Sequence, residues 1–345
     1  MKKILIHGLS LINNNLFNEI SRDDCNRPFI ILKNELFKRG YDLQTSDKCI
    51  LNDDVRYIFF FDVPSFRRYK SFRGYLLLLY SFFLNKPITR DLYKECLKKK
   101  YQNKMILFLW EASAICPQNC EIKHHAMFSK IFTWNDDLIN YNKYQKIYIP
   151  NSVLTFNFPY TTFNKKKLLV NISMNKFSNH PNELYGERRK LIKYFEFTQK
   201  DNFDLYGIGW NKKNGKILFS KNYSSYKGEI SNKGSVLSQY KFCICFENIY
   251  GENGYITEKI LDCLKYGCIP IYFGAPNVKE YIDSGIFLDY REFKSLDSLN
   301  RYISNFGEIE YIKFKNRLEC FLKSDKYHRF SPEYFANTII NSLEI

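Results

Sequence analysis

The pattern of apolar and polar positions is sharpest between residues 241 and 276. An unbroken apolar run at 242–246 lies between polar residues, which is typical of a parallel strand buried on both faces. A helix is predicted over 258–266, because its apolar side chains share one face and Gly267 suits a helix end. A second apolar run at 269–273 completes a βαβ unit. Polar residues after the first strand should therefore lie at the sheet edge where α/β proteins bind ligands.

Similar patterns along the chain predict strands that alternate with helices. In the first half, strands are expected at 4–7, 41–45, 57–61, 105–110, 131–133 and 147–149, with a helix at 29–39. In the second half, strands are expected at 168–173 and 203–207, a further strand and helix before 240, and helices at 183–196 and 332–343. The last helix has a good start, with serine as its N-cap and proline at its first position. Alternation of this kind predicts an α/β fold with doubly wound sheets.

The length of the chain predicts two domains, since 345 residues exceed what one core ordinarily supports. A stretch at 159–167 combines proline, threonine, asparagine and three successive lysines, which suits a hinge. We therefore expect a Rossmann-like domain at 1–160, a second one at 161–330, and a C-terminal helix at 331–345 packed on one of them.

Composition and charge narrow the class of partner. Hydrophobic residues make up 45% of the chain, which excludes a disordered protein. The formal net charge of +16 favours a polyanionic partner, which leaves a nucleotide diphosphate, an anionic membrane or a nucleic acid. The 10 cysteines and five histidines show no metal-ligand spacing. A reduced, cytosolic protein without a metal site is therefore expected.

The sequence predicts no secretory or membrane-crossing segment. The first residues read as a buried strand and lack the pattern of a signal peptide. The longest apolar stretch, 75–84, is well short of the ~20 residues that span a bilayer. It lies in a basic segment, 66–100, which is either a helical excursion with an inward apolar face or a surface that touches anionic membrane. Nucleic-acid binding is the third reading, but no nucleic-acid motif supports it.

Lys259 is a cation in the first turn of the helix predicted at 258–266, where it opposes the helix macrodipole. Something negative should offset its charge. One reading is a local ion pair with Glu258 or Glu247. The other is a bound phosphate, which the helix N-terminus and the ammonium group would hold together.

Arg188 lies on the apolar stripe of the helix predicted at 183–196. A guanidinium in that position must be paired, so it forms either a structural salt bridge or a bidentate clamp on a diphosphate. Glu111 follows the apolar strand at 105–110, at the carboxyl edge of the other sheet. It is either a general base or a paired cleft-edge carboxylate. Asn175, Lys176 and Lys227 are further candidates for phosphate contact.

Residues 246–274 carry the pattern FENxxxxxGYxTEKxxxxxxxGxIPIYxG, which closely resembles the signature of the family 10 glycosyltransferases, the α-1,3/1,4-fucosyltransferases. The matching positions are Phe246, Glu247, Asn248, Tyr255, Thr257, Glu258, Lys259, Pro270 and Gly274. The match is dense within this segment and weak around it. The resemblance implies a GDP-fucose site in which Tyr255, Glu258 and Lys259 contact the donor, with Asn248 beside them.

The resemblance also implies a GT-B fold, in which two Rossmann-like domains face each other across a cleft. It implies inverting transfer of L-fucose from GDP-β-L-fucose to a glycan containing GlcNAc or galactose, forming an α-1,3 or α-1,4 linkage. Glu111 matches the proposed base of the family, although Ala112 replaces the usual asparagine. Glu247 or Glu258 would stabilise the developing ring charge or bind ribose. Arg188 and Lys259 would neutralise the leaving group, so no cofactor is required, and Mn²⁺ or Mg²⁺ stimulation stays open.

The expected partners are therefore GDP-fucose and an oligosaccharide or lipid-linked glycan acceptor, with no nucleic acid. Without an anchor the chain resembles the soluble bacterial or viral kind, which would be cytoplasmic, with optional contact at the inner membrane face. Two other function classes stay open. One is a GT-B transferase that uses another GDP-deoxy-sugar, and the other is a non-catalytic module that binds a nucleotide sugar or a glycan.

Overall fold

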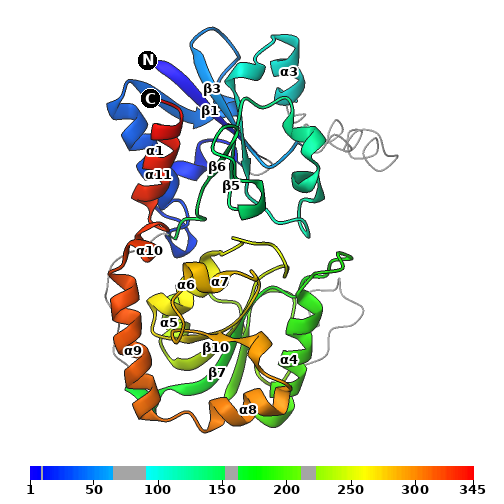
Figure 1. Ribbon diagram of the computed structural model, residues 1–345, viewed down its shortest axis with the longest axis vertical. Coiled ribbons are helices and arrows are strands. Elements are labelled where there is room, and N and C mark those ends of the chain that lie inside the picture. The colour runs from blue at the N-terminus through cyan, green and yellow to red at the C-terminus, as the bar shows by residue number, and fades with distance from the viewer. Residues whose placement is uncertain (9–10, 65–90, 152–161, 211–222) are drawn as a thin grey trace.

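The computed structural model forms two lobes, each with a parallel sheet (Figure 1). It describes residues 1–8, 11–64, 91–151, 162–210 and 223–345. The apolar stretch at 75–84 lies outside the described residues, as do residues 66–90 of the basic segment and the first part of the predicted hinge.

The first lobe is built on a six-stranded sheet with the order β2-β1-β3-β4-β5-β6. Its elements are β1 (Lys2–His7), α1 (Arg27–Lys38), β2 (Tyr41–Thr45), β3 (Val55–Phe61), α3 (Leu92–Lys98), β4 (Met105–Leu109), β5 (Lys130–Thr133) and β6 (Tyr144–Lys146). All neighbouring strands pair in parallel. The central strands are almost wholly buried, which explains why their sequences are continuous apolar runs.

One strand of this sheet was predicted wrongly. The expected strand at 147–149 is instead β6, which pairs with β5 through Tyr144–Lys146. Ile147 and Ile149 are buried as the chain leaves the sheet, so their apolar character reflects core packing rather than strand pairing. β6 is an edge strand of half-buried residues, and its sequence therefore lacks an apolar run.

The second lobe carries a sheet with the order β12-β11-β10-β7-β8-β9. Its strands are β7 (Lys167–Ile172), β8 (Phe203–Tyr206), β9 (Tyr226–Gly228), β10 (Tyr240–Phe246), β11 (Ile269–Phe273) and β12 (Leu288–Asp289). Its helices are α4 (Tyr185–Thr198), α5 (Lys233–Leu237), α6 (Glu258–Lys265), α7 (Val278–Tyr281), α8 (Leu296–Ser304), α9 (Glu308–Leu322) and α10 (Asp325–His328). The predicted β10–α6–β11 unit is confirmed.

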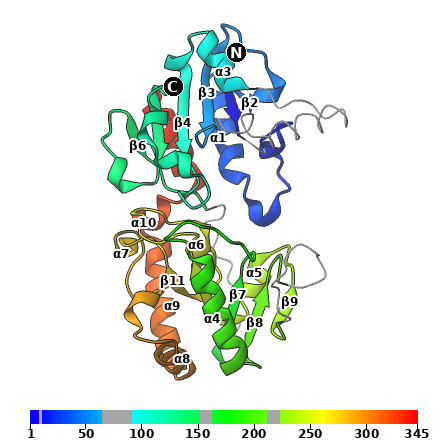
Figure 2. The same cartoon turned by 90° about the vertical axis from the view of Figure 1, so that its right-hand side faces the viewer.

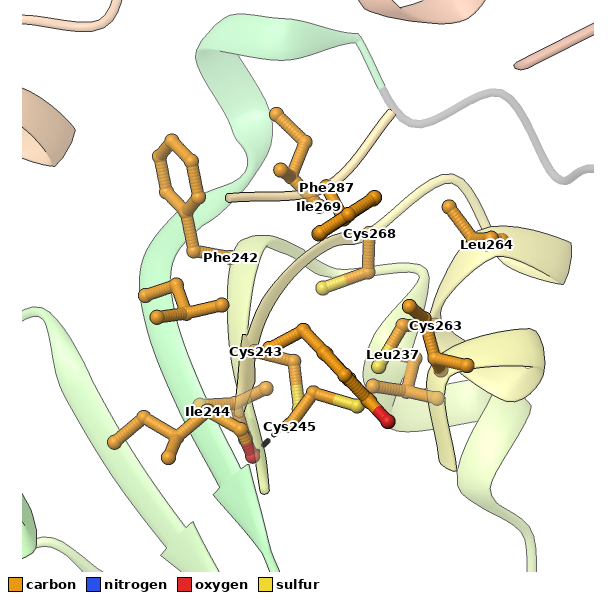
Figure 3. Packing of buried hydrophobic residues seen from close by; sticks show 14 of the residues in the cluster. Leu237, Phe242, Cys243, Ile244, Cys245, Cys263, Leu264, Cys268, Ile269 and Phe287 are labelled. Carbon is orange, nitrogen blue, oxygen red and sulfur yellow. Dashed lines mark hydrogen bonds between the residues drawn. The ribbon is translucent and has the colours of Figure 1, made fainter. Parts of the chain in front are cut away.

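The core of the second lobe contains several cysteines that pack as small apolar side chains. Figure 3 shows Cys243 and Cys245 of β10 near Cys263 of α6 and Cys268, the residue before β11. All four are buried, and none forms a disulfide. Free cysteine behaves in such a core as a small hydrophobe.

The last helix, α11 (Pro332–Ser342), returns to the first lobe and packs beside α1 (Figure 1). Its buried residues belong to the same core cluster as β1 and α1. The ring of Phe335 lies 5.8 Å from that of Phe29, edge to face. The predicted helix is thus present, and it ties the C-terminus to the N-terminal lobe.

Each sheet reverses its strand order at one point. In the second lobe the chain runs outward from β7 through β8 and β9, and then returns to place β10 on the other side of β7. In the first lobe the reversal lies between β1 and β3. Such switch points leave a crevice at the carboxyl ends of the strands, where ligands of doubly wound folds bind. Figures 1 and 2 show the N-terminal end of α6 on the side of its lobe that faces the other lobe.

Within the part of the chain that the structure describes, no helix has both the length and the apolar character to cross a membrane.

Candidate functional site

A cavity of about 2010 Å³ is lined by residues of both lobes. Arg188 and Lys259 line it from the second lobe, and Glu111 lines it from the first. Arg188 belongs to α4, which follows β7, and Lys259 belongs to α6, which follows β10. The two cations therefore flank the switch point of the second sheet, as expected for a ligand site in this fold.

Lys259 contacts a carboxylate on one side and lines the cavity on the other. Its ammonium group lies 3.0 Å from Oε2 of Glu247 and 3.9 Å from Oε1 of Glu258. Burial acts to lower the pKa of Lys259, but the charges of Glu247 and Glu258 outweigh it and raise the pKa. The local ion pair predicted from the sequence is present, and the side chain of Lys259 remains 27% exposed and lines the cavity.

Glu247 itself is fully buried and is not part of the cavity wall. Its carboxylate accepts hydrogen bonds from the backbone N–H and the hydroxyl of Thr257 and from the ammonium of Lys259. The expectation that it binds ribose or faces the sugar ring is therefore not met in this structure. Its contacts make it a positioning group, which holds the start of α6 and orients Lys259.

Arg188 is 5% exposed and donates from Nη2 to the backbone carbonyls of Phe246 and Glu247, at 2.5 and 3.0 Å. No carboxylate of the described residues forms an ion pair with it, so the salt-bridge alternative is not realised. Burial lowers the pKa of Arg188, and the charge of Glu247 opposes that effect. A buried guanidinium without a carboxylate partner, on the wall of a cavity, is suited to bind an anion.

The other predicted residues near the start of α6 differ in position. Glu258 lines the cavity with a side chain that is 44% exposed, and Asn248 also lines it. Burial acts to raise the pKa of Glu258, but the charges of Lys259 and Lys233 outweigh it and lower the pKa. An ionised, exposed carboxylate at this point can accept hydrogen bonds from hydroxyl groups of a ligand.

Tyr255 does not reach the cavity in this structure. It is 3% exposed, and its ring packs against Trp134 of the other lobe with centroids 4.7 Å apart. The amide of Asn248 donates to its hydroxyl at 3.4 Å. The expected contact with the donor is thus replaced by packing between the lobes, because the loop before α6 places the ring against the first lobe.

Two expected phosphate ligands also lie off the cavity wall. Asn175 donates from its side chain to the carbonyl of Gly209 at 3.1 Å. Lys227 lies 3.5 Å from Asp204 in a surface ion pair on β9. Lys176, the neighbour of Asn175, lines the cavity instead. Both residues of this pair were candidates from the sequence, and the direction of the side chains in the loop decides that only the lysine reaches the cavity.

Glu111 follows β4, as predicted, and lines the same cavity from the first lobe. Burial is the main cause that raises its pKa, with the charge of Asp62 as the next cause. Lys259 and Lys176 lower the pKa of Glu111 and so oppose this effect. A carboxylate with a raised pKa is better suited to accept a proton near neutral pH.

The sequence reasoning missed Asp62 and Lys233, which also line the cavity. Asp62 directly follows the apolar strand β3, so the rule that found Glu111 would have found it too. Lys233 pairs with Asp262 of α6 at 2.7 Å, and its backbone N–H donates to Asp23 of the other lobe at 3.0 Å. That contact joins segments more than two hundred residues apart, and no local pattern indicates it.

Comparison with known proteins identifies the second lobe. A model of the C-terminal region of glycosyltransferase family 10, the fucosyltransferases, matches residues 163–325. This part of the chain belongs to glycosyltransferase family 10. The family 10 region contains Arg188, Glu258 and Lys259, while Glu111 lies outside it. The resemblance drawn from the motif at 246–274 is thereby confirmed.

Curated relatives match over short segments. The α-(1,3)-fucosyltransferase of Helicobacter pylori is 45% identical over 74 residues, which cover 21% of this chain and 15% of that protein. The α-(1,4)-fucosyltransferase of Arabidopsis thaliana is 38% identical over 86 residues, which cover 24% and 21%. GDP-fucose protein O-fucosyltransferase 3 of Xenopus laevis is 53% identical over 49 residues, which cover 14% and 10%. The matches thus span less than a quarter of each relative.

Solved structures match over the whole chain. An α1,3-fucosyltransferase crystallised with GDP has a TM-score of 0.55 and 16% identity, and the match covers 100% of this chain and 90% of that one. A glycosyltransferase from Rickettsia africae has a TM-score of 0.54 and 12% identity, with 99% and 98% covered. At these identities the likeness establishes the fold. The protein has the two-lobed GT-B architecture that the sequence predicted.

Proposed function

We propose that this protein is an inverting fucosyltransferase. It would move L-fucose from GDP-β-L-fucose to a hydroxyl of a glycan that contains GlcNAc or galactose, forming an α-1,3 or α-1,4 linkage. The observation that carries the proposal is that Arg188 and Lys259 line the cavity from the second lobe while Glu111 lines it from the first. The family of the second lobe supports GDP-fucose as the donor.

The two cations suit the leaving group. As the bond between the sugar and GDP breaks, negative charge grows on the diphosphate. Arg188 is already desolvated and held by two backbone carbonyls, so it stabilises this charge with little reorganisation. Lys259 adds a second positive charge at the N-terminus of α6, whose dipole also favours an anion. We propose that this pair replaces a metal ion, so that transfer needs no cofactor.

Glu111 suits the role of general base. It would take the proton from the acceptor hydroxyl as that oxygen attacks the sugar from the face opposite the diphosphate. Attack from the opposite face converts a β-linked donor into an α-linked product. Glu258 would accept hydrogen bonds from hydroxyl groups of the donor.

The acceptor would be an oligosaccharide or a lipid-linked glycan. All ten cysteines are free, which supports a reducing compartment, and we propose the cytoplasm with optional contact at the inner face of the membrane. No role in nucleic-acid binding is proposed.

The test is an assay of product formation with a panel of donors and acceptors. GDP-fucose, GDP-mannose and UDP-glucose are each offered with galactosyl–GlcNAc disaccharides, and products are identified by mass spectrometry and linkage analysis. We expect fucosylated product from GDP-fucose alone. Product from another GDP-sugar would point to the alternative transferase, and GDP binding without turnover by any donor would point to a binding module. Either result contradicts the proposal.

A further inference from the structure

Asp62 lies beside Glu111 at the carboxyl edge of the first sheet. It follows β3 directly, and Glu111 follows the neighbouring strand β4, with Phe61 paired to Phe108 at the strand ends. The backbone of Asp62 has a φ of 66°, and its N–H donates to the carbonyl of Phe108 at 2.8 Å. The chain therefore turns sharply after β3, which directs the side chain of Asp62 toward the segment that carries Glu111.

One oxygen of Asp62 holds that segment. Its Oδ1 accepts hydrogen bonds from the backbone N–H groups of Trp110 and Glu111, at 2.8 and 2.9 Å. It also accepts a bond from Nδ2 of Asn119 at 2.7 Å. The same Nδ2 donates to the carbonyl of Glu111 at 2.8 Å, so Asn119 links the two residues from the other side.

The remaining backbone group of this dipeptide is also bonded to a side chain. The carbonyl of Trp110 accepts from Nε1 of Trp134 at 3.0 Å. Side chains therefore form hydrogen bonds with all four backbone polar groups of Trp110 and Glu111. A loop residue held in this way has little freedom to drift, which is the condition for a base that must meet a hydroxyl at hydrogen-bond distance.

The charges around Glu111 come from three parts of the fold. Asp62, after β3, and Glu258, on α6, are negative and favour the protonated form of Glu111. Lys259, on α6, and Lys176, in the loop after β7, are positive and favour its ionised form. The uncharged titratable groups that interact with Glu111 are Cys116, Tyr185 and Tyr255.

We propose that Asp62 is the positioning residue of the general base: its hydrogen bonds fix the backbone of Glu111, and its negative charge strengthens Glu111 as a proton acceptor. Asp62 need not touch the sugar for this role. The inference rests on the proposed function, because it concerns the base of the same reaction. It adds a residue that lies outside the family 10 region and outside the motif at 246–274.

The decisive variant is Asp62→Asn, which keeps the shape of the side chain and an oxygen that accepts the same three hydrogen bonds. Only the charge is lost. We expect the acidic limb of the kcat–pH profile to move to lower pH by roughly 0.5–1 unit, because a nearby like charge no longer opposes ionisation of Glu111. The plateau kcat should fall, while the Kd for GDP stays unchanged. A control, Asp53→Asn, removes an exposed charge of the same lobe and should leave the profile in place.

A profile of Asp62→Asn that coincides with the wild type overturns the inference. Should that variant fail to fold, the wild-type profile is the second measurement, because it shows whether Glu111 is a strengthened proton acceptor at all. Its acidic limb must lie above the ordinary glutamate pKa of about 4.3, and a limb at or below that value overturns the inference. If the wild type transfers no fucose, the proposed function is wrong, and this inference is wrong as well. If the wild type transfers fucose but the acidic limb of the Asp62→Asn profile does not move, only this inference is wrong.

Discussion

At the scale of single residues, Lys259 has two roles, one toward Glu247 and one toward the cavity. Its ammonium contacts the buried carboxylate of Glu247, and it also lines the cavity where we place the diphosphate. The pair is held in a dry environment, where removal of one member leaves an uncompensated charge. Lys259 is therefore expected to matter both for the stability of the empty protein and for donor binding.

Replacing Lys259 with methionine should weaken GDP binding by about 10–100-fold, since a charge-assisted contact contributes about 1.5–3 kcal/mol. The free energy of unfolding should also fall, by about 3–5 kcal/mol, because Glu247 is left buried and unpaired. Isothermal titration calorimetry with GDP measures the first effect, and chemical denaturation measures the second.

Lys227→Met is the matched control for that experiment. Lys227 was also expected to bind phosphate, but the structure pairs it with Asp204. Its removal should leave the Kd for GDP within about twofold, since exposed ion pairs contribute little. Equal weakening in both variants would show that net charge, rather than the cavity, governs GDP binding.

Glu111→Gln should lower kcat by about 10²–10⁴-fold, the usual contribution of a general base. The Kd for GDP-fucose should stay near that of the wild type, because Glu111 lines the cavity from the first lobe while the two cations belong to the second. Steady-state kinetics and calorimetry together measure both values. Near-normal turnover in this variant would rule out Glu111 as the base.

At the scale of elements, the site depends on how α6 begins. Thr257 is the N-cap residue, and its hydroxyl both accepts from the N–H of Lys259 and donates to the carboxylate of Glu247. The same side chain thus caps the start of the helix and donates a hydrogen bond to the buried carboxylate of Glu247. α4 supplies the second cation in a simpler way, since Arg188 lies in its first two turns on the buried face.

Thr257→Val keeps the shape of the side chain and removes the hydrogen bonds of the hydroxyl to Glu247 and Lys259. We expect a loss of about 2–4 kcal/mol in the free energy of unfolding, from an N-cap of about 1 kcal/mol and a bond to a charged group of about 1.5–3 kcal/mol. Thr338→Val in α11 is the control, because its hydroxyl bonds only to the carbonyl of Tyr334 within the same helix. Urea denaturation of both variants measures the difference, and similar small losses would contradict the role given to Thr257.

The helices between residues 278 and 328 show the limit of pattern reading at this scale. α8 and α9 are regular helices, yet the sequence analysis predicted no element between residues 274 and 331. α9 buries Tyr311, Phe314, Leu318 and Phe321, which follow helical spacing. This helical spacing is present in the sequence. Exposed apolar residues such as Ile309 and Ile312 lie between the buried ones, so the apolar face of the helix is hard to recognise from the sequence.

At the scale of the whole molecule, polar contacts hold the two lobes together. Asp136 of the first lobe accepts hydrogen bonds from Lys146 and from the hydroxyl of Tyr281, each at about 2.6 Å. Burial acts to raise the pKa of Asp136, but the hydrogen bonds from Lys146 and Tyr281 outweigh it and lower the pKa below 3.8. A lowered carboxylate pKa contributes stability above the unfolded value, and this contribution is lost as pH falls through the folded value.

Tyr281→Phe should therefore destabilise the protein most at neutral pH. We expect a loss of about 1.5–3 kcal/mol at pH 7, because the carboxylate of Asp136 loses a donor. The difference from the wild type should shrink below pH 3.8, where Asp136 becomes protonated. Denaturation curves over a pH series measure it. Tyr302→Phe, at a half-exposed tyrosine of α8, is the control and should show no such dependence.

The amino-acid sequence by itself determined the two sheets, the β10–α6–β11 unit and the family of the second lobe. Strands buried on both faces must be apolar throughout, and helices must repeat at 3.6 residues, so these elements leave patterns within short stretches of chain. Arg188 and Glu111 could be selected for the same reason. One is a charge on an apolar stripe, and the other is a carboxylate at the end of a buried strand.

Only the tertiary structure decided which side chains reach the cavity. Lys176 lines it and Lys227 does not, Tyr255 packs on Trp134, and Asp62 holds the backbone of Glu111. Each of these outcomes depends on contacts between segments that are far apart in the chain or on the direction of a loop residue. The short-range periodicity of apolar residues does not predict such contacts. Packing between the segments selects one arrangement from the many that the local sequence allows.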